Sequence, residues 1–104
     1  MKLMTKALEA RFAQLGEQDI PDAVVAAKFF SPTSNWTWYV TAYFPEDRLF
    51  FGLVKGFETE LGYFSRDELE SVVGPLGLGI ERDLHWSETT LDKVREKLDS
   101  RAHV

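Results

Sequence analysis

The stretch from Lys28 to Ser65 constrains the fold most, because it holds twelve of the fourteen aromatic residues of this 104-residue chain. Its clearest segment, WTWYVTAYF (36–44), has the period of two that is typical of a β-strand. The Pro45-Glu46-Asp47 run predicts a tight turn, and RLFFGLV (48–54) predicts the antiparallel partner strand. Gly52 within that partner indicates a bulge or a close backbone approach. Two shorter segments predict further strands: AVVAAKFF (23–30) and LGYFS (61–65).

The alternation in 36–44 also predicts how side chains divide between the two faces of the sheet. A regular strand places one set on a single face: Thr37, Tyr39, Thr41 and Tyr43. The other face would carry Trp36, Trp38, Val40, Ala42 and Phe44. Exposed tyrosines are favoured at protein interfaces, which makes Tyr39 and Tyr43 candidate partner-binding residues. The alternative is a half-covered sheet face that binds nothing.

Helices are predicted on both sides of these strands by apolar spacing and end caps. The first spans residues 5–15, with Thr5 as N-cap and Gly16 after its last residue. Its apolar residues recur at i, i+4 and i+7, namely Leu8, Phe12 and Leu15. The capping box formed by Ser65 and Glu68 predicts a second helix from Arg66. The apolar face of that helix would be Leu69, Val72 and Val73, before Gly74-Pro75 ends it.

The C-terminal third predicts one more extended segment and one more helix. IERDLHW (80–86) indicates an edge strand or an extended segment, and 87–100 indicates a helix capped by Thr89 or Thr90. The apolar side of this helix would be Leu91, Val94 and Leu98. Successive strands with helices at the ends predict one α+β domain over 1–104, a small antiparallel sheet of four to five strands flanked by about three helices. Residues 95–104 are expected to be partly frayed.

Composition restricts the classes of function. The chain has no cysteine, which excludes disulfides and thiolate metal sites. It has no apolar run of the roughly 20 residues that a membrane span needs, and its first residues lack a signal-peptide pattern, so we expect a cytoplasmic monomer. A net charge of −5 argues against phosphate-backbone binding as the main activity. Direct nucleic-acid binding is the alternative if the fold brings one set of basic terminal residues together as a patch: Lys2, Lys6, Arg95, Lys97 and Arg101.

The negative charge is concentrated in the middle of the chain. Residues 1–15 carry +2 and residues 89–104 carry +1, so the total of −5 leaves −8 for the segment between them. Several of the acidic residues lie close together in sequence: Glu58, Glu60, Asp67, Glu68 and Glu70. Such a set is a candidate partner-binding patch for a basic surface, or a mimic of a phosphate track. The alternative is a solvated face that keeps the protein soluble.

The sequence contains weak indications of catalysis. Glu81, Asp83 and His85 alternate, so in an extended segment they could hold a divalent metal or pair a carboxylate with a histidine base. A network in which Arg82, Asp83 or His85 ties this segment down is the alternative. The glycine-rich run 74–79 lacks the Lys-Ser/Thr of a P-loop and the last glycine of a dinucleotide fingerprint. We therefore expect no cofactor, no bound metal and no catalytic residues.

Four segments resemble a family of bacterial proteins of similar length that is classed as a domain of unknown function. They are the opening MKLMTK, NWTWY (35–39), FFGLVKGFETELGYFS (50–65) and ELESVVGPLGLGIERDLHW (68–86). The resemblance covers residues 1–95. Members of that family occur on plasmids, conjugative elements and phages, and they include a reported type II-A anti-CRISPR inhibitor of Cas9.

The resemblance implies a non-enzymatic anti-CRISPR protein that inhibits type II-A Cas9 by stoichiometric binding. The partner would be Cas9 or the Cas9–guide RNA complex, whose basic channels an acidic surface could occupy. Two alternatives remain open. One is a protein-interaction module of plasmids or phages with no role at Cas9. The other is a small metal-dependent enzyme that uses Asp83 and His85.

Overall fold

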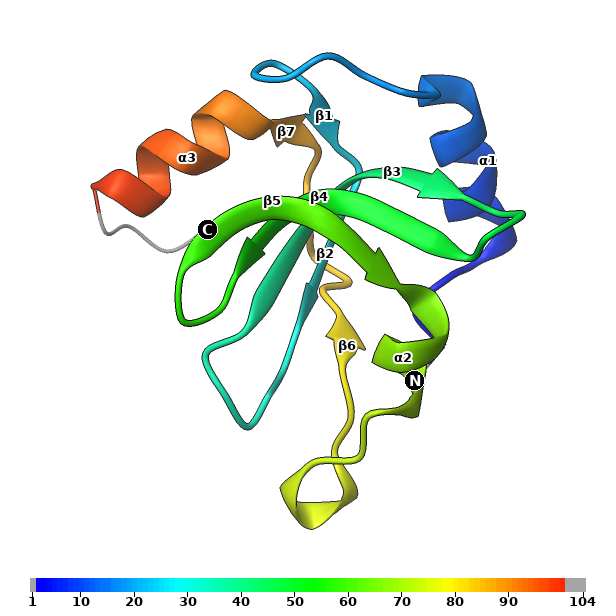
Figure 1. The fold of residues 1–104 in the computed structure, drawn as a ribbon, viewed down its shortest axis with the longest axis vertical. Helices are drawn as coiled ribbons and strands as arrows, with labels where there is room; N and C mark the ends of the chain where they lie inside the picture. Colours follow the sequence, from blue (N-terminus) through cyan, green and yellow to red (C-terminus); the bar gives the residue numbers. More distant parts are fainter. Residues whose placement is uncertain (1, 101–104) are drawn as a thin grey trace.

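The aromatic stretch forms the centre of a five-stranded antiparallel sheet in the computed structural model, which describes residues 2–100. Three long strands follow one another as hairpins: β3 (Thr37–Phe44), β4 (Leu49–Lys55) and β5 (Thr59–Ser65). Two shorter strands, β2 (Ala27–Phe30) and β6 (Glu81–Arg82), complete the order β5-β4-β3-β2-β6 (Figure 1). β5 and β6 are therefore its edges, and the expected edge strand within 80–86 is confirmed over two residues.

A second, two-stranded sheet pairs β1 (Val24–Val25) with β7 (Thr89–Thr90). The predicted strand 23–30 is thus divided, with 24–25 in this second sheet and 27–30 in the five-stranded sheet. The sequence pattern does not predict β7. The side chain of Gln18 explains the division. Its amide nitrogen donates to the carbonyls of Val24 at 3.0 Å and Thr41 at 2.9 Å, and its oxygen accepts from Val24 N–H at 2.8 Å. These bonds occupy backbone groups that would otherwise be available for strand pairing.

The helices begin where their caps predict. α1 (Lys6–Leu15) follows Thr5, whose hydroxyl accepts from the N–H of Leu8 at 3.1 Å, and ends at Gly16 with φ of 62°. α2 (Arg66–Ser71) follows Ser65, whose hydroxyl accepts from the N–H of Glu68 at 3.1 Å. Both predicted N-caps are confirmed, because side-chain capping depends only on residues three apart in sequence.

The two C-terminal helical elements differ in detail from the prediction. α2 ends at Ser71, so Val72 and Val73 are outside it and are 43% and 78% exposed, and their assignment to its apolar face is wrong. The short 3-10 turn η1 (Pro75–Gly77) follows. α3 (Leu91–Asp99) buries Leu91 and Val94 as predicted. It includes residues 95–99, for which the sequence predicts partial fraying, whereas 101–104 lie outside the described residues.

Each face of the sheet packs against different helices, which confirms the α+β class. We call the face toward α1 and α2 face A; its main core residues are Phe12, Phe29, Trp38, Val40, Tyr43, Phe50 and Leu69. Face B packs against α3, with core residues Val25, Tyr39, Leu53, Leu91 and Val94 (Figure 1). Full burial of an apolar or aromatic side chain stabilises a fold by about 1.5–3 kcal/mol. Two cores of this kind place β3 between apolar layers.

A bulge in β3 changes which face its side chains occupy. The β3–β4 register shifts between Val40 and Ala42, leaving Thr41 as the extra residue. Tyr39 therefore lies in the face B core and Tyr43 in the face A core. The predicted stripe on a single face is wrong, since one inserted residue reverses the alternation beyond it. The close backbone approach at Gly52 is confirmed, because a Cβ there would lie 1.9 Å from the carbonyl oxygen of Tyr39.

Candidate interaction surface at the β4–β5 hairpin

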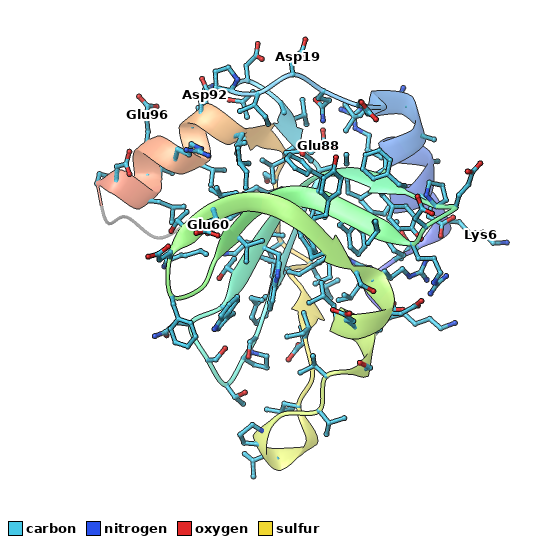
Figure 2. All side chains as sticks on the ribbon, in the orientation of Figure 1. Lys6, Asp19, Glu60, Glu88, Asp92 and Glu96 are labelled. Atoms are coloured by element: carbon cyan, nitrogen blue, oxygen red, sulfur yellow. The ribbon has the colours of Figure 1, made fainter. Side chains whose placement is uncertain are left out.

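The five acidic residues that are close in sequence separate to the two ends of β5. Glu58 precedes the strand, and Glu60, which is labelled in Figure 2, is its second residue. Asp67, Glu68 and Glu70 belong to α2, which follows the other end. Seven strand residues at roughly 3.3 Å each span about 20 Å. The five residues therefore form two groups at opposite ends of β5.

Two of the three acidic residues in α2 are engaged in contacts within the molecule. Asp67 accepts from Arg48 Nε at 2.7 Å. Glu70 accepts from the N–H of Leu3 at 3.0 Å and from Arg66 Nε at 3.3 Å, and its side chain is 20% exposed. These bonds join α2 to the N-terminal segment and to the turn that precedes β4. Glu70 is therefore placed to stabilise the fold rather than to meet a partner.

Tyr39 and Tyr43 are both buried, with 2% and 9% of their surface exposed. Burial raises the pKa of Tyr39. The Tyr43 hydroxyl accepts from Arg66 Nη1 at 3.0 Å, and the Arg66 guanidinium lies 5.9 Å from the centre of the Tyr43 ring. Neither side chain can serve as the exposed contact surface that the sequence suggested, because both contribute to the cores.

The turn between β4 and β5 carries the most exposed aromatic residue of residues 2–100. Phe57 is 95% exposed, and it helps to line a shallow pocket of about 330 Å³ on face A. We call this surface the hairpin-tip pocket; its lining residues are Trp36, Val54, Phe57, Glu58 and Glu60. It combines two aromatic rings, one aliphatic side chain and two carboxylates.

The backbone of the turn fixes the aromatic walls of the hairpin-tip pocket. The N–H of Gly56 donates to the carbonyl of Glu58 at 3.0 Å and closes the turn. A Cβ at Gly56 would approach the ring of Trp36 to 2.5 Å, so glycine lets the indole lie against the turn. The rings of Trp36 and Phe57 then meet edge to face, with centroids 5.6 Å apart and planes at 84°. Trp38, only 7% exposed, lies next to Trp36, with the two ring centroids 6.0 Å apart.

The charge of this pocket is not balanced within the described structure. No ion pair among residues 2–100 involves Glu58 or Glu60, and no lysine or arginine of that range lines the pocket. Sequence reasoning identified both carboxylates but missed Trp36 and Phe57 as their neighbours. The available signal was an aromatic residue directly after Gly56 in a hairpin turn, where a large apolar side chain has little to bury against.

The residues proposed for metal or acid–base chemistry have structural partners. Asp83 accepts from the N–H of His85 at 2.9 Å and lies 3.7 Å from Lys28 Nζ. Glu81 pairs with Phe30 at the β2–β6 edge. Within residues 2–100, no group of three histidine, cysteine or acidic side chains is arranged to hold a metal ion. The alternation of Glu81, Asp83 and His85 thus does not bring the three together as ligands.

A second exposed apolar feature follows α2. The loop 72–78, which we call the Leu76 loop, extends away from the sheet (Figure 1) and contains no charged residue. Leu76 is 94% exposed at its tip and has a left-handed backbone with φ of 61°. The loop is closed by the N–H of Gly74, which donates to the carbonyl of Leu78 at 2.7 Å.

Comparison with known proteins identifies the family. No curated protein and no solved structure matches the chain. No helix within residues 2–100 combines the length and the apolar composition needed to cross a lipid bilayer. A family model described as "Protein of unknown function (DUF2958)" matches residues 2–96, nearly the whole chain. The resemblance to a family classed as a domain of unknown function is thereby confirmed, and the chain belongs to the DUF2958 family.

Proposed function

We propose that this protein is a binding module that occupies a basic surface of another protein through its hairpin-tip pocket. The observation that carries the proposal is Phe57, which is 95% exposed beside two carboxylates that no described cation neutralises. Exposed aromatic residues are enriched at the centres of interfaces, where they supply most of the binding energy. The adjacent carboxylates favour a positively charged partner.

Cas9 is the partner that the sequence resemblance implies, and we propose it as the target. It is a large protein with positively charged channels for guide RNA and DNA, and a small acidic module can compete for such a surface. Stoichiometric binding needs no catalytic group. A protein of this kind, carried by a phage or another mobile genetic element, would protect that element from cleavage.

A cleavage assay with purified components tests this function. Guide-loaded Cas9 cuts a target duplex while this protein is added from substoichiometric amounts to a large excess. Occupation of Cas9 predicts that cutting falls in proportion to the protein added and reaches its minimum near equimolar amounts. Unchanged cutting at large excess would remove Cas9 as the target, and full inhibition at a small fraction of the Cas9 concentration would indicate an enzyme instead.

A further inference from the structure

We propose that the hairpin-tip pocket binds one arginine side chain of the partner, stacked on its aromatic walls and hydrogen-bonded to its carboxylates. This inference rests on the proposed function and specifies the chemistry of the residue that the partner inserts. The pocket volume of about 330 Å³ leaves room for one inserted side chain.

The aromatic walls favour a cation. Trp36 and Phe57 both line the pocket, with their ring planes almost perpendicular, at 84°. The faces of aromatic rings carry negative potential, and tryptophan attracts cations most strongly of the aromatic side chains. The neighbouring ring of Trp38 and the turn at Gly56 hold the indole in place before a ligand binds. Such preorganisation lowers the cost of binding.

The carboxylates favour arginine over lysine. A guanidinium is planar, stacks on aromatic faces and forms two parallel hydrogen bonds with one carboxylate. Glu58 and Glu60 both line the pocket and are exposed, so either can accept such a pair without rearrangement of the core. An ammonium is more strongly hydrated and cannot bind a carboxylate in this planar way.

The cation nearest to the hairpin tip in sequence, Lys55, does not line the hairpin-tip pocket. Lys55 immediately precedes the turn, but it lines a second pocket with Tyr39 and Leu98, which shares only Trp36 with the hairpin-tip pocket. Alternation along β4 explains this separation, because Val54 and Lys55 point to opposite faces. The hairpin-tip pocket is therefore accessible to a cation from another molecule.

NMR titration of the full chain with the peptide acetyl-Gly-Arg-Gly-amide tests the inference without Cas9. We expect saturable shifts in the indole N–H of Trp36 and in the backbone signals of Gly56 and Phe57. The matched peptide with citrulline, which has the same shape without the charge, should bind about tenfold more weakly. The lysine peptide should fall between the two. Equal binding of the arginine and citrulline peptides, or shifts confined to other regions, would overturn the proposal.

Substitutions in the hairpin-tip pocket identify which side chains contact the arginine peptide. The double substitution Glu58→Gln with Glu60→Gln should reduce affinity for the arginine peptide about tenfold, and Phe57→Ala should reduce it about threefold. Glu96→Gln, an exposed carboxylate on α3 (Figure 2), is the control and should leave affinity unchanged. An equal loss of affinity in the control would refute the site.

The peptide comparison in the unaltered protein does not depend on any variant. Binding of Cas9 without binding of the arginine peptide would refute this site alone, whereas the reverse would refute only the Cas9 proposal.

Discussion

Leu76 shows how a single residue can be strained and exposed at once. Its φ of 61° is in the left-handed region, which costs a non-glycine residue about 1–2 kcal/mol, and its side chain buries almost nothing in return. Glycine adopts this conformation freely but loses about 0.5–1 kcal/mol in entropy on folding. We therefore expect Leu76→Gly to raise the free energy of unfolding by up to about 1 kcal/mol in urea denaturation.

Leu78→Gly is the control for this prediction, because Leu78 has an ordinary φ of −83°. Glycine there should lower the free energy of unfolding. A loss of stability in both variants would show that Leu76 is held by contacts rather than strained.

The ion pair between Arg11 and Glu88 predicts a dependence of stability on pH. Arg11 donates two hydrogen bonds to the carboxylate, at 2.9 and 2.8 Å, and this bonding lowers the pKa of Glu88. A carboxylate with a lowered pKa in the folded state stabilises the protein above its unfolded pKa of about 4.3, and that contribution is lost as the pH falls through the folded value. The effect is small, since both side chains are partly solvated.

Glu88→Gln should therefore reduce the loss of stability between about pH 5 and pH 3, as measured by thermal unfolding at each pH. His85→Gln, three residues away in the chain and exposed, should leave the profile in that range unchanged. An unchanged slope in Glu88→Gln would show that other carboxylates determine the acid sensitivity.

At the scale of elements, two glycines that pair across β4 and β5 should respond very differently to alanine. A Cβ at Gly52 would lie 1.9 Å from the carbonyl oxygen of Tyr39, whereas a Cβ at Gly62 meets no atom within 4 Å. Gly52→Ala should lower the free energy of unfolding by about 3 kcal/mol or more, because the β3 bulge must move. Gly62→Ala should change it by less than about 1 kcal/mol. Similar values for the two variants in denaturant titrations would contradict the bulge geometry.

The acidic residues of α2 provide a second contrast. Glu70 binds the N–H of Leu3 and Arg66, whereas the side chain of Glu68 is exposed. Glu70→Gln should cost about 1–3 kcal/mol of stability, and Glu68→Gln less than about 0.5 kcal/mol. Circular dichroism during thermal unfolding distinguishes them. Equal effects would mean that α2 is not tied to the N-terminal segment as described.

Local sequence signals predict most of the helices and strands. Contacts between residues that are distant in sequence determine the features that those signals miss. The caps at Thr5 and Ser65 need only neighbouring residues, and both are confirmed. The β3 bulge depends on Gly52 across the hairpin and on Gln18, which is 23 residues from Thr41. A period of two cannot reveal an insertion whose causes lie elsewhere in the chain. The division of 23–30 between two sheets has the same origin.

At the scale of the whole molecule, the residues of the candidate site are likewise only partly predictable from the sequence. Glu58 and Glu70 are close in sequence, but β5 separates them, whereas Trp36 and Phe57 are far apart in sequence and in contact. The β3–β4 register brings the latter pair together, because Thr37 pairs with Lys55. Composition alone predicted a negatively charged surface, and the fold decides which carboxylates remain available to a partner.

The central claim is that the hairpin tip, rather than the overall negative charge, recognises the partner. Calorimetric titration of guide-loaded Cas9 compares the unaltered protein with two double charge reversals. Glu58→Lys with Glu60→Lys changes the tip, and Glu46→Lys with Glu96→Lys changes exposed sites elsewhere by the same total charge. We predict one-to-one binding that the tip variant weakens about tenfold or more and the control by less than about threefold. Equal weakening by both variants would contradict the claim.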